Sequence, residues 1–370
     1  MRTDWQSLPF GGAVSDESGG NIKTPQSEFQ AAGRFPIVDQ GKELISGYTD
    51  DPERICKAPL PVIVFGDHTR CFKFIDFPFC MGADGVKVLR PRIAVHEKYL
   101  FHYLRSLHLP NAGYDWHFKY LKRTEVKLPP LAEQRRIAAI LDQAEALRAK
   151  RRHALTQLDT LTQSLFLNLF GHPIQNEKGW PIGELGSVAR VERGKFTPRP
   201  RNDPTYYDGP FPFIQTGDIS SSEGRLKLWS QTLNEKGIAV SRSFPPGTVV
   251  VAIVGATLGI TAILDIEVYC PDSVIGIQVH SDKASSEYIE RVLRFWRPIF
   301  VAQAPETARA NINLETLRPL RIPLPPLPLQ REFAAQVSAV ERLKASQRAS
   351  LAKLDALFAS LQYRAFRGEL

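Results

Sequence analysis

Five basic residues fall within twelve positions, Arg190 to Arg201, where the sequence reads RVERGKFTPRPR. One glycine and two prolines in this stretch predict a loop rather than a helix or strand. Arginine donates paired hydrogen bonds to guanine edges and to phosphates, so a basic loop suits a DNA groove. The candidate DNA contacts are Arg193, Lys195, Thr197, Arg199 and Arg201. A solvated basic loop without a ligand is the alternative.

Polar and basic residues elsewhere give a weaker version of the same signal. Segments 116–122 and 308–313 each precede an expected long helix and contain lysine, arginine or asparagine, which can contact phosphates and adenine. The further candidate DNA contacts are Lys23, Thr24, His68, Arg70, Lys119, Lys122, Arg309 and Asn311. For several of them the alternative is a residue that only solvates a turn.

The sequence offers no comparable signal for catalysis. Asp203-Pro-Thr-Tyr206 differs from the base-holding motif of amino-methyltransferases at its third position, and it is expected to be a turn. Neither a nucleotide-binding glycine loop nor an H-E-x-x-H or G-x-S-x-G motif is present. A dispersed Ser/His/Asp arrangement stays open. We therefore expect no catalytic residue, metal site or cofactor on this chain.

Composition and charge favour a cytoplasmic protein with more than one domain. The 370 residues are 43% hydrophobic and 23% charged, which is typical of globular domains. The four cysteines lack metal-ligand spacing and are expected to be reduced, buried thiols. The most apolar segment, 248–264, contains two glycines and is too short to span a membrane, so it predicts two buried strands around a turn.

One sequence element occurs twice, and it organises the chain. Residues 128–170 align without a gap to 324–366 with 19 identities in 43 positions, beginning LPPLAEQR and LPPLPLQR. Apolar residues return every three or four positions in both copies, which predicts two helices of about 36 residues. Such helices would pair most simply as an antiparallel coiled coil. Two separate helices, each lying across its own domain, are the alternative.

The segments before the two helices also resemble each other, for example Trp5-Gln-Ser-Leu8 and Trp180-Pro-Ile-Gly-Glu-Leu185. We therefore predict an α/β (α+β) protein made of two globular domains and two long helices, with internal pseudo-twofold symmetry. The expected segments are a first domain at 1–128, a helix at 129–171, a second domain at 172–323 and a helix at 324–370.

These residues give the chain a family resemblance. The repeated helix sequence, with its second copy ending in LQYRAFRGEL, and the two preceding domains resemble the specificity subunits of type I DNA restriction–modification systems. The resemblance covers essentially the whole chain. One departure is Leu329, which stands where the first copy has Glu133.

The resemblance implies a non-catalytic subunit whose two target-recognition domains each read one half of a bipartite, asymmetric site in double-stranded DNA. It implies that the helices set the spacer and dock two methyltransferase subunits, with two restriction/translocase subunits outside. S-adenosylmethionine, ATP and Mg²⁺ would then belong to those partners, which would supply adenine methylation and ATP-dependent cleavage. The expected subunit-interface residues are Glu133, Gln134, Arg135, Gln330 and Arg331. An independent methyltransferase or nuclease and a DNA-independent helical scaffold are the competing functions.

Overall fold

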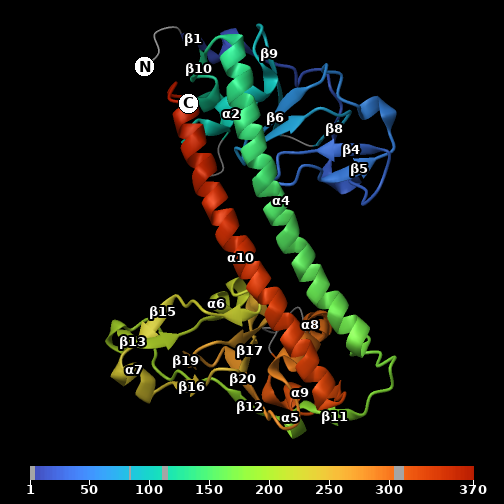
Figure 1. Cartoon of the computed structure of the whole chain (residues 1–370), viewed down its shortest axis with the longest axis vertical. Coiled ribbons are helices and arrows are strands. Elements are labelled where there is room, and N and C mark those ends of the chain that lie inside the picture. The colour runs from blue at the N-terminus through green and yellow to red at the C-terminus, as the bar shows by residue number, and fades with distance from the viewer. Residues whose placement is uncertain (1–4, 83–84, 111–115, 304–311) are drawn as a thin grey trace. The chain divides into compact units, whose positions relative to one another are not determined.

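The computed structural model describes residues 5–82, 85–110, 116–303 and 312–370. The chain forms two compact units. Unit 1 comprises Met1–His153 and Arg348–Leu370, and unit 2 comprises Ala154–Gln347. Each unit therefore contains one globular domain together with part of each of two long helices, α4 (Leu131–Phe170) and α10 (Leu327–Ala365) (Figure 1).

Unit 1 contains two four-stranded sheets and a two-stranded ribbon. The first sheet has the order β2-β9-β6-β7, formed by Val14–Asp16, Val86–Pro91, Val62–Gly66 and Phe72–Ile75. The second has the order β3-β8-β4-β5, formed by Lys23–Thr24, Cys80–Gly82, Phe35–Val38 and Gly47–Thr49. The antiparallel ribbon pairs β1 (Gln6–Pro9) with β10 (Glu125–Leu128), just before α4 begins. Its shorter elements are α1 (Phe10–Ala13), α2 (Glu97–Ser106), α3 (Phe118–Leu121) and the 3-10 turns Gln26–Glu28 and Pro52–Arg54.

Unit 2 repeats this plan, with one strand more in one of its sheets. A five-stranded sheet has the order β12-β20-β17-β18-β14, formed by Ala189–Arg193, Val274–Val279, Val249–Ala252, Thr261–Leu264 and Arg225–Leu226. A four-stranded sheet has the order β15-β13-β19-β16, formed by Gln231–Leu233, Tyr207–Phe213, Val268–Cys270 and Arg242–Phe244. The ribbon pairs β11 (Ile182–Glu184) with β21 (Arg321–Pro323), just before α10. The remaining elements are α5 (Leu185–Val188), α6 (Thr216–Ser221), α7 (Glu235–Ala239), α8 (Ser286–Ala302), α9 (Leu314–Leu317) and the 3-10 turns Pro204–Tyr206 and Gly255–Thr257.

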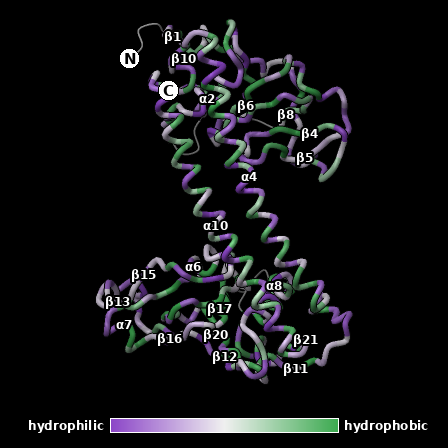
Figure 2. Tube along the Cα trace, in the orientation of Figure 1, coloured by the Kyte–Doolittle hydropathy of each residue, from purple (hydrophilic) through white to green (hydrophobic). Residues whose placement is uncertain are grey.

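The central strands form where β-branched and aromatic residues follow one another. Val62–Gly66 and Val249–Ala252 are buried at every position, which β-branched side chains favour because they pack well on a pleated surface. The prediction of two buried strands around a turn in 248–264 is confirmed by β17 and β18. Figure 2 shows hydrophobic positions collected in these strands, whereas hydrophilic and hydrophobic positions alternate along both long helices.

Both long helices contribute to the core of each domain. In unit 1, Ile137 and Leu141 from α4 and Phe358 from α10 belong to the same buried cluster as the domain's own residues. In unit 2 the corresponding residues are Phe166 and Phe170 from α4 and Phe333 from α10. Within each unit the two helices run antiparallel, and the mixed α/β architecture with paired long helices is confirmed. The alternative of two unpaired helices was wrong, because each domain core needs the start of one helix and the end of the other.

Equivalent aromatic contacts in the two units show that both have the same local architecture. Tyr99 on α2 donates a hydrogen bond from its hydroxyl to Lys127 O at 2.6 Å and packs edge-on against Phe366. Tyr288 on α8 donates to Pro323 O at 2.8 Å and packs edge-on against Phe170. The phenylalanines occupy matching positions in the two sequence copies, at the ends of the two helices.

Candidate nucleic-acid interface

The basic segment of unit 2 is held by one residue, Asp272. Arg190 and Arg193 lie on β12, so the prediction of a loop is wrong for these two and holds only from Gly194 onward. Asp272 Oδ1 accepts from Arg201 at 2.5 Å, Asp272 Oδ2 from Arg199 at 3.4 Å, and the Asp272 carbonyl from Arg193 Nε at 2.5 Å. All three arginines remain exposed. Because these cations are tethered, they present a fixed arrangement rather than three independently mobile side chains, and less rotamer entropy is lost on binding.

Lys195 and Thr197 are exposed between these tethered arginines. Phe196, between them, is buried and packs on Phe213 with ring centroids 5.0 Å apart. Alternation of buried and exposed residues holds this part of the loop against the domain. The organising role of Asp272 was missed from the sequence, because it lies 71 residues away from Arg201 and in no motif.

In unit 1 the turn between β6 and β7 brings two of the predicted residues together. His68 and Arg70 lie in this turn, and the His68 ring lies 4.3 Å from the ring of Trp116, which is 50% exposed. Lys119 and Lys122 follow on and just after α3, and both are exposed. An exposed tryptophan beside histidine and lysines combines a stacking surface with phosphate-binding cations.

Other predicted DNA contacts are placed differently. Lys23 is exposed on β3, but Thr24 is completely buried, so its hydroxyl does not reach the surface and Thr24 is corrected to an interior residue. The strand periodicity explains the difference, because successive side chains of β3 point to opposite faces. Arg309 and Asn311 lie outside the described residues.

The two predicted interface glutamines occupy the interior of their units. Gln134 is 4% exposed; its amide nitrogen donates to Pro129 O at 2.8 Å, and its amide oxygen accepts from His96 N at 2.9 Å. Gln330 is fully buried and repeats both bonds, to Pro325 O at 2.8 Å and from Ser285 N at 3.0 Å. His96 and Ser285 are the N-caps of α2 and α8. Each glutamine thus fixes its long helix to its own domain instead of facing a partner.

The surface positions near the helix starts differ between the copies. Glu133 pairs with Arg136 at 2.9 Å, and Arg136 also donates to Leu370 O at 2.6 Å. In the second copy Leu329 and Glu332 stand at these two positions, so this pair is not repeated. Arg135 and Arg331 are both exposed, and Arg331 donates to Ser281 O at 3.3 Å.

Ion-pair triads between the helices, by contrast, occur at equivalent positions in both units. In unit 1, Arg148 of α4 reaches Glu145 at 2.7 Å and Asp355 of α10 at 2.5 Å. In unit 2, Lys344 of α10 reaches Glu341 at 2.8 Å and Asp159 of α4 at 2.6 Å. Each triad therefore has a nearly buried cation on one helix and one carboxylate on the other, which fixes the helix register.

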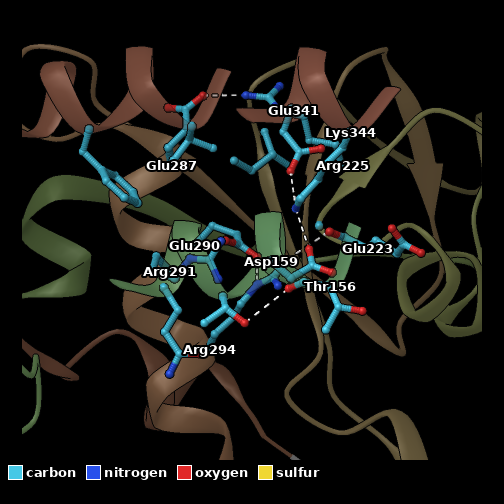
Figure 3. Close-up of a pocket in the computed structure, with 16 residues that line it drawn as sticks. Thr156, Asp159, Glu223, Arg225, Glu287, Glu290, Arg291, Arg294, Glu341 and Lys344 are labelled. Carbon is cyan, nitrogen blue, oxygen red and sulfur yellow. Dashed lines mark hydrogen bonds and ion pairs between the residues drawn. The ribbon is translucent and has the colours of Figure 1, made fainter. Parts of the chain in front are cut away.

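A cavity of about 280 Å³ lies beside the second triad, between the two helices and the domain of unit 2 (Figure 3). In its lining, Arg225 donates to Glu287 and also to Asp265 outside the cavity, each at 2.7 Å, and Glu290 accepts from Thr261, likewise outside it, at 2.9 Å. Its lining carries both carboxylates and cations, and most of them are already paired. This mixture does not select for an anion, so we assign the cavity a structural role.

The family follows from a comparison of the sequence with protein-family models. Residues 17–157 and 177–355 each match the type I restriction modification DNA specificity domain. The chain belongs to this family. The two matched specificity domains cover most of the chain, one match beginning in each globular domain and extending into the helix that follows it.

Individual relatives agree with this assignment. A curated relative, the Escherichia coli type I restriction enzyme EcoR124I/EcoR124II specificity subunit, is 26% identical over 163 residues, which is 40% of each chain. A crystal structure of a type I restriction-modification S subunit from M. genitalium has a TM-score of 0.61 at 14% identity, over 98% of this chain and 96% of that one. A structure from work on complex assembly and conformational transition of the type I system has a TM-score of 0.54 at 19% identity, over 100% and 99% of the two chains. At these identities the two structures show a shared fold.

Two observations concern membranes and metals. Across the described part of the chain, neither long helix nor any shorter one is apolar enough over sufficient length to cross a membrane. Within residues 5–82, 85–110, 116–303 and 312–370, no group of three His, Cys, Asp or Glu side chains is arranged to hold a metal ion.

Proposed function

We propose that this chain is the DNA specificity subunit of a type I restriction–modification complex, and that each unit reads one half of a bipartite, asymmetric site in double-stranded DNA. The observation that carries the proposal is the pair of matched specificity domains, each built around its own sheets and each joined to both long helices. Duplication of the domain supplies two readers, and divergence of their surfaces makes the two half-sites different.

The cations of the two units support unlike half-sites. Unit 1 carries them in the β6–β7 turn, which contains His68 and Arg70. The corresponding turn of unit 2, Gly255-Ala-Thr-Leu-Gly259, contains no charged residue. In that unit the candidate cations instead lie in the segment that hydrogen-bonds to Asp272. Two surfaces built from different elements present different hydrogen-bond donors to a DNA groove, so they select different bases.

The long helices are proposed to set the number of unread base pairs between the half-sites. A matched insertion of seven residues in both helices, after Arg152 and after Arg348, lengthens each helix by about 10 Å and keeps the heptad pattern. The recognised spacer should then grow by about three base pairs while both half-sites stay unchanged. An unaltered spacer would contradict this role.

Repeat-related leucines on the helices suit the docking of two methyltransferase subunits. Leu147 and Leu357 in unit 1 are 44% and 50% exposed, and Leu343 and Leu161 in unit 2 are 54% and 43% exposed. Three of the leucines directly precede a residue that contacts the other helix; for example, the Arg148 guanidinium lies 4.4 Å from the Phe358 ring, and Lys344 pairs with Asp159. The fourth, Leu161, precedes the buried Thr162. Because the helices are antiparallel, a step of about 100° back on each one points both leucines of a unit to the same side. Each unit thus offers one apolar patch of the same composition.

The partners and cofactors complete the proposal. DNA binding and docking are assigned to this chain, whereas methyl transfer and ATP-dependent cleavage are assigned to two methyltransferase and two restriction/translocase subunits. Those subunits would bind S-adenosylmethionine, ATP and Mg²⁺. A purified chain that methylated or cut DNA without partners would contradict this division.

Methylation sequencing of the host genome tests the function directly. Cells with the intact gene should carry methylated adenines at one bipartite sequence with two unlike halves and a fixed spacer. Cells lacking only this chain should lose that methylation. If the methylated sites were the same in both strains, the chain would not determine DNA specificity, as expected of a DNA-independent scaffold.

A further inference from the structure

A groove of about 540 Å³ lies on unit 1, bounded by the β6–β7 turn, the start of β7 and the segment that follows α2. The described residues that line it are Lys42, Arg70, Cys71, Phe72, Lys73, Arg105, Leu107, His108 and Leu109. Four of these side chains are cationic, one is histidine, and none carries a carboxylate. Arg70 was already a candidate DNA contact, whereas the other cations come from three further places in the sequence.

The floor of the groove contains a buried lysine that is held by an aspartate. Lys73 is 6% exposed, and its Nζ donates to Asp39 O at 2.8 Å and lies 3.4 Å from Asp39 Oδ1. Asp39 in turn accepts from Ser46 at 2.5 Å and from Gly41 N at 2.8 Å. Burial lowers the pKa of Lys73, although Asp39 opposes this shift. An anion in the groove would favour the charged ammonium.

The walls of the groove are also fixed. Arg70 has a φ of 60°, a left-handed conformation that is uncommon for arginine and that costs free energy unless neighbouring contacts impose it. Here Arg70 N donates to Gly66 O at 2.7 Å, and Gly66 N donates to Cys71 O at 2.8 Å, which closes the turn. On the opposite wall Arg105 lies 3.7 Å from Glu145, outside the lining.

We propose that this groove binds phosphate groups of the DNA backbone beside the bases that unit 1 reads, an inference that rests on the proposed function. Its lining is positive and contains no carboxylate, which suits polyanion binding. The same β6–β7 turn carries His68, whose ring lies 4.3 Å from that of the exposed Trp116 with the two planes tilted by 48°. The turn therefore joins a phosphate site to an aromatic surface suited to bases, and backbone contacts of this kind position a reader without carrying sequence information themselves.

Cys71 provides a reporter within the groove. The cysteines Cys56, Cys80 and Cys270 are buried, whereas Cys71 is partly exposed, which corrects the expectation that all four thiols are buried. N-ethylmaleimide should therefore react fastest at Cys71 of the full-length chain. A 40-base-pair duplex carrying the mapped site should slow this reaction at least about fivefold. An unrelated duplex should give the same protection, but only at a higher duplex concentration. Protection by 1 mM inorganic phosphate to the same degree would assign the groove to a small anion instead.

Substitution tests the same groove by affinity. The double variant Lys42→Ala/Arg70→Ala should weaken binding to both duplexes by a similar factor, about 5- to 30-fold near 100 mM salt. The slope of the logarithm of the binding constant against the logarithm of the salt concentration should become smaller in magnitude by about 2. A matched control, Arg34→Ala/Lys57→Ala, removes two exposed cations of unit 1 outside the groove and should change both values much less.

The outcomes separate this inference from the proposed function. If the wild-type chain prefers the mapped duplex but DNA leaves Cys71 alkylation unchanged, the groove assignment is wrong and the function stands. Since that measurement uses the unmodified protein, it decides the question even where a substituted variant folds poorly. If the wild-type chain binds both duplexes equally, alone and with its methyltransferase, the proposed function itself fails.

Discussion

Lys344 Nζ lies 2.6 Å from Asp159 Oδ1 on the neighbouring long helix, and the sequence copy of this pair, Arg148 and Asp355, is bonded at 2.5 Å. The residue types change between the copies, from arginine to lysine, but the carboxylates and the geometry are kept. A buried cation whose partners are removed loses its compensation for desolvation. These two pairs therefore fix helix register at equivalent places in both units.

Removal of one cation should destabilise its unit. Lys344→Ala leaves Asp159 and Glu341 without their partner and should lower the free energy of unfolding by about 1–3 kcal/mol, less than a fully buried pair because Asp159 is largely exposed. Lys344→Arg should restore most of the loss, since arginine serves at the equivalent site. Chemical denaturation measures both, with the exposed Lys353→Ala on the same helix as control. Equal losses for Lys344→Ala and Lys353→Ala would show that the triad has no special role.

The two buried glutamines should contribute to the stability of their units. Gln134→Leu or Gln330→Leu leaves the N-cap amide of α2 or α8 and a proline carbonyl without partners, at an expected cost of about 2–4 kcal/mol. Exposed Gln143→Leu should change stability by less than about 0.5 kcal/mol. Hydrogen exchange of α2 for the first variant and α8 for the second provides the local readout, and unchanged protection there would contradict the role.

Acid should weaken unit 1 through a buried histidine. Burial lowers the pKa of His102 despite its 2.8 Å hydrogen bond to Asp142, which also contacts Lys98 at 2.7 Å. Below pH 6.5 the unfolded chain binds the proton more readily than the folded one, so the free energy of unfolding should fall as pH drops from 7.5 to 5. Asp142 stays ionised in this range because its pKa is lowered. His102→Gln should show a smaller dependence on pH over the same interval, and an identical slope would exclude His102 as the cause.

The exposed leucines should control assembly. Leu147→Glu/Leu357→Glu places two charges on the apolar patch of unit 1 and should abolish docking of one methyltransferase subunit, with Leu161→Glu/Leu343→Glu doing the same in unit 2. Native mass spectrometry should then find one methyltransferase bound instead of two. A comparable double change at the exposed Ala139 and Ala335 is the control. Two bound subunits in the leucine variants would place docking elsewhere.

The helices, the α/β class and the family resemblance were predictable because local periodicity and repetition carry them. The placement of the side chains predicted to contact DNA or partner subunits was less predictable. Thr24 and the two glutamines were misplaced because burial depends on tertiary packing, which the spacing of polar residues does not report. Asp272 was missed for a related reason: its hydrogen bonds to Arg199 and Arg201 join positions 73 and 71 residues apart, which the sequence does not show to be neighbours. The cations of the groove in unit 1 likewise come from separate segments.

The Asp272→Ala variant tests whether each unit reads its own half-site, because the base preference can be measured at every position of both half-sites. This change releases Arg199 and Arg201 from their anchor, whereas Asp282→Ala removes the same charge from an exposed position without an ion pair among the described contacts. Methylation sequencing of cells carrying each variant should show relaxed sequence preference, about 5- to 20-fold, in one half-site for Asp272→Ala only, with the other half-site and the spacer unchanged. Equal relaxation of both half-sites, or of neither, would contradict the claim that each unit reads its own half.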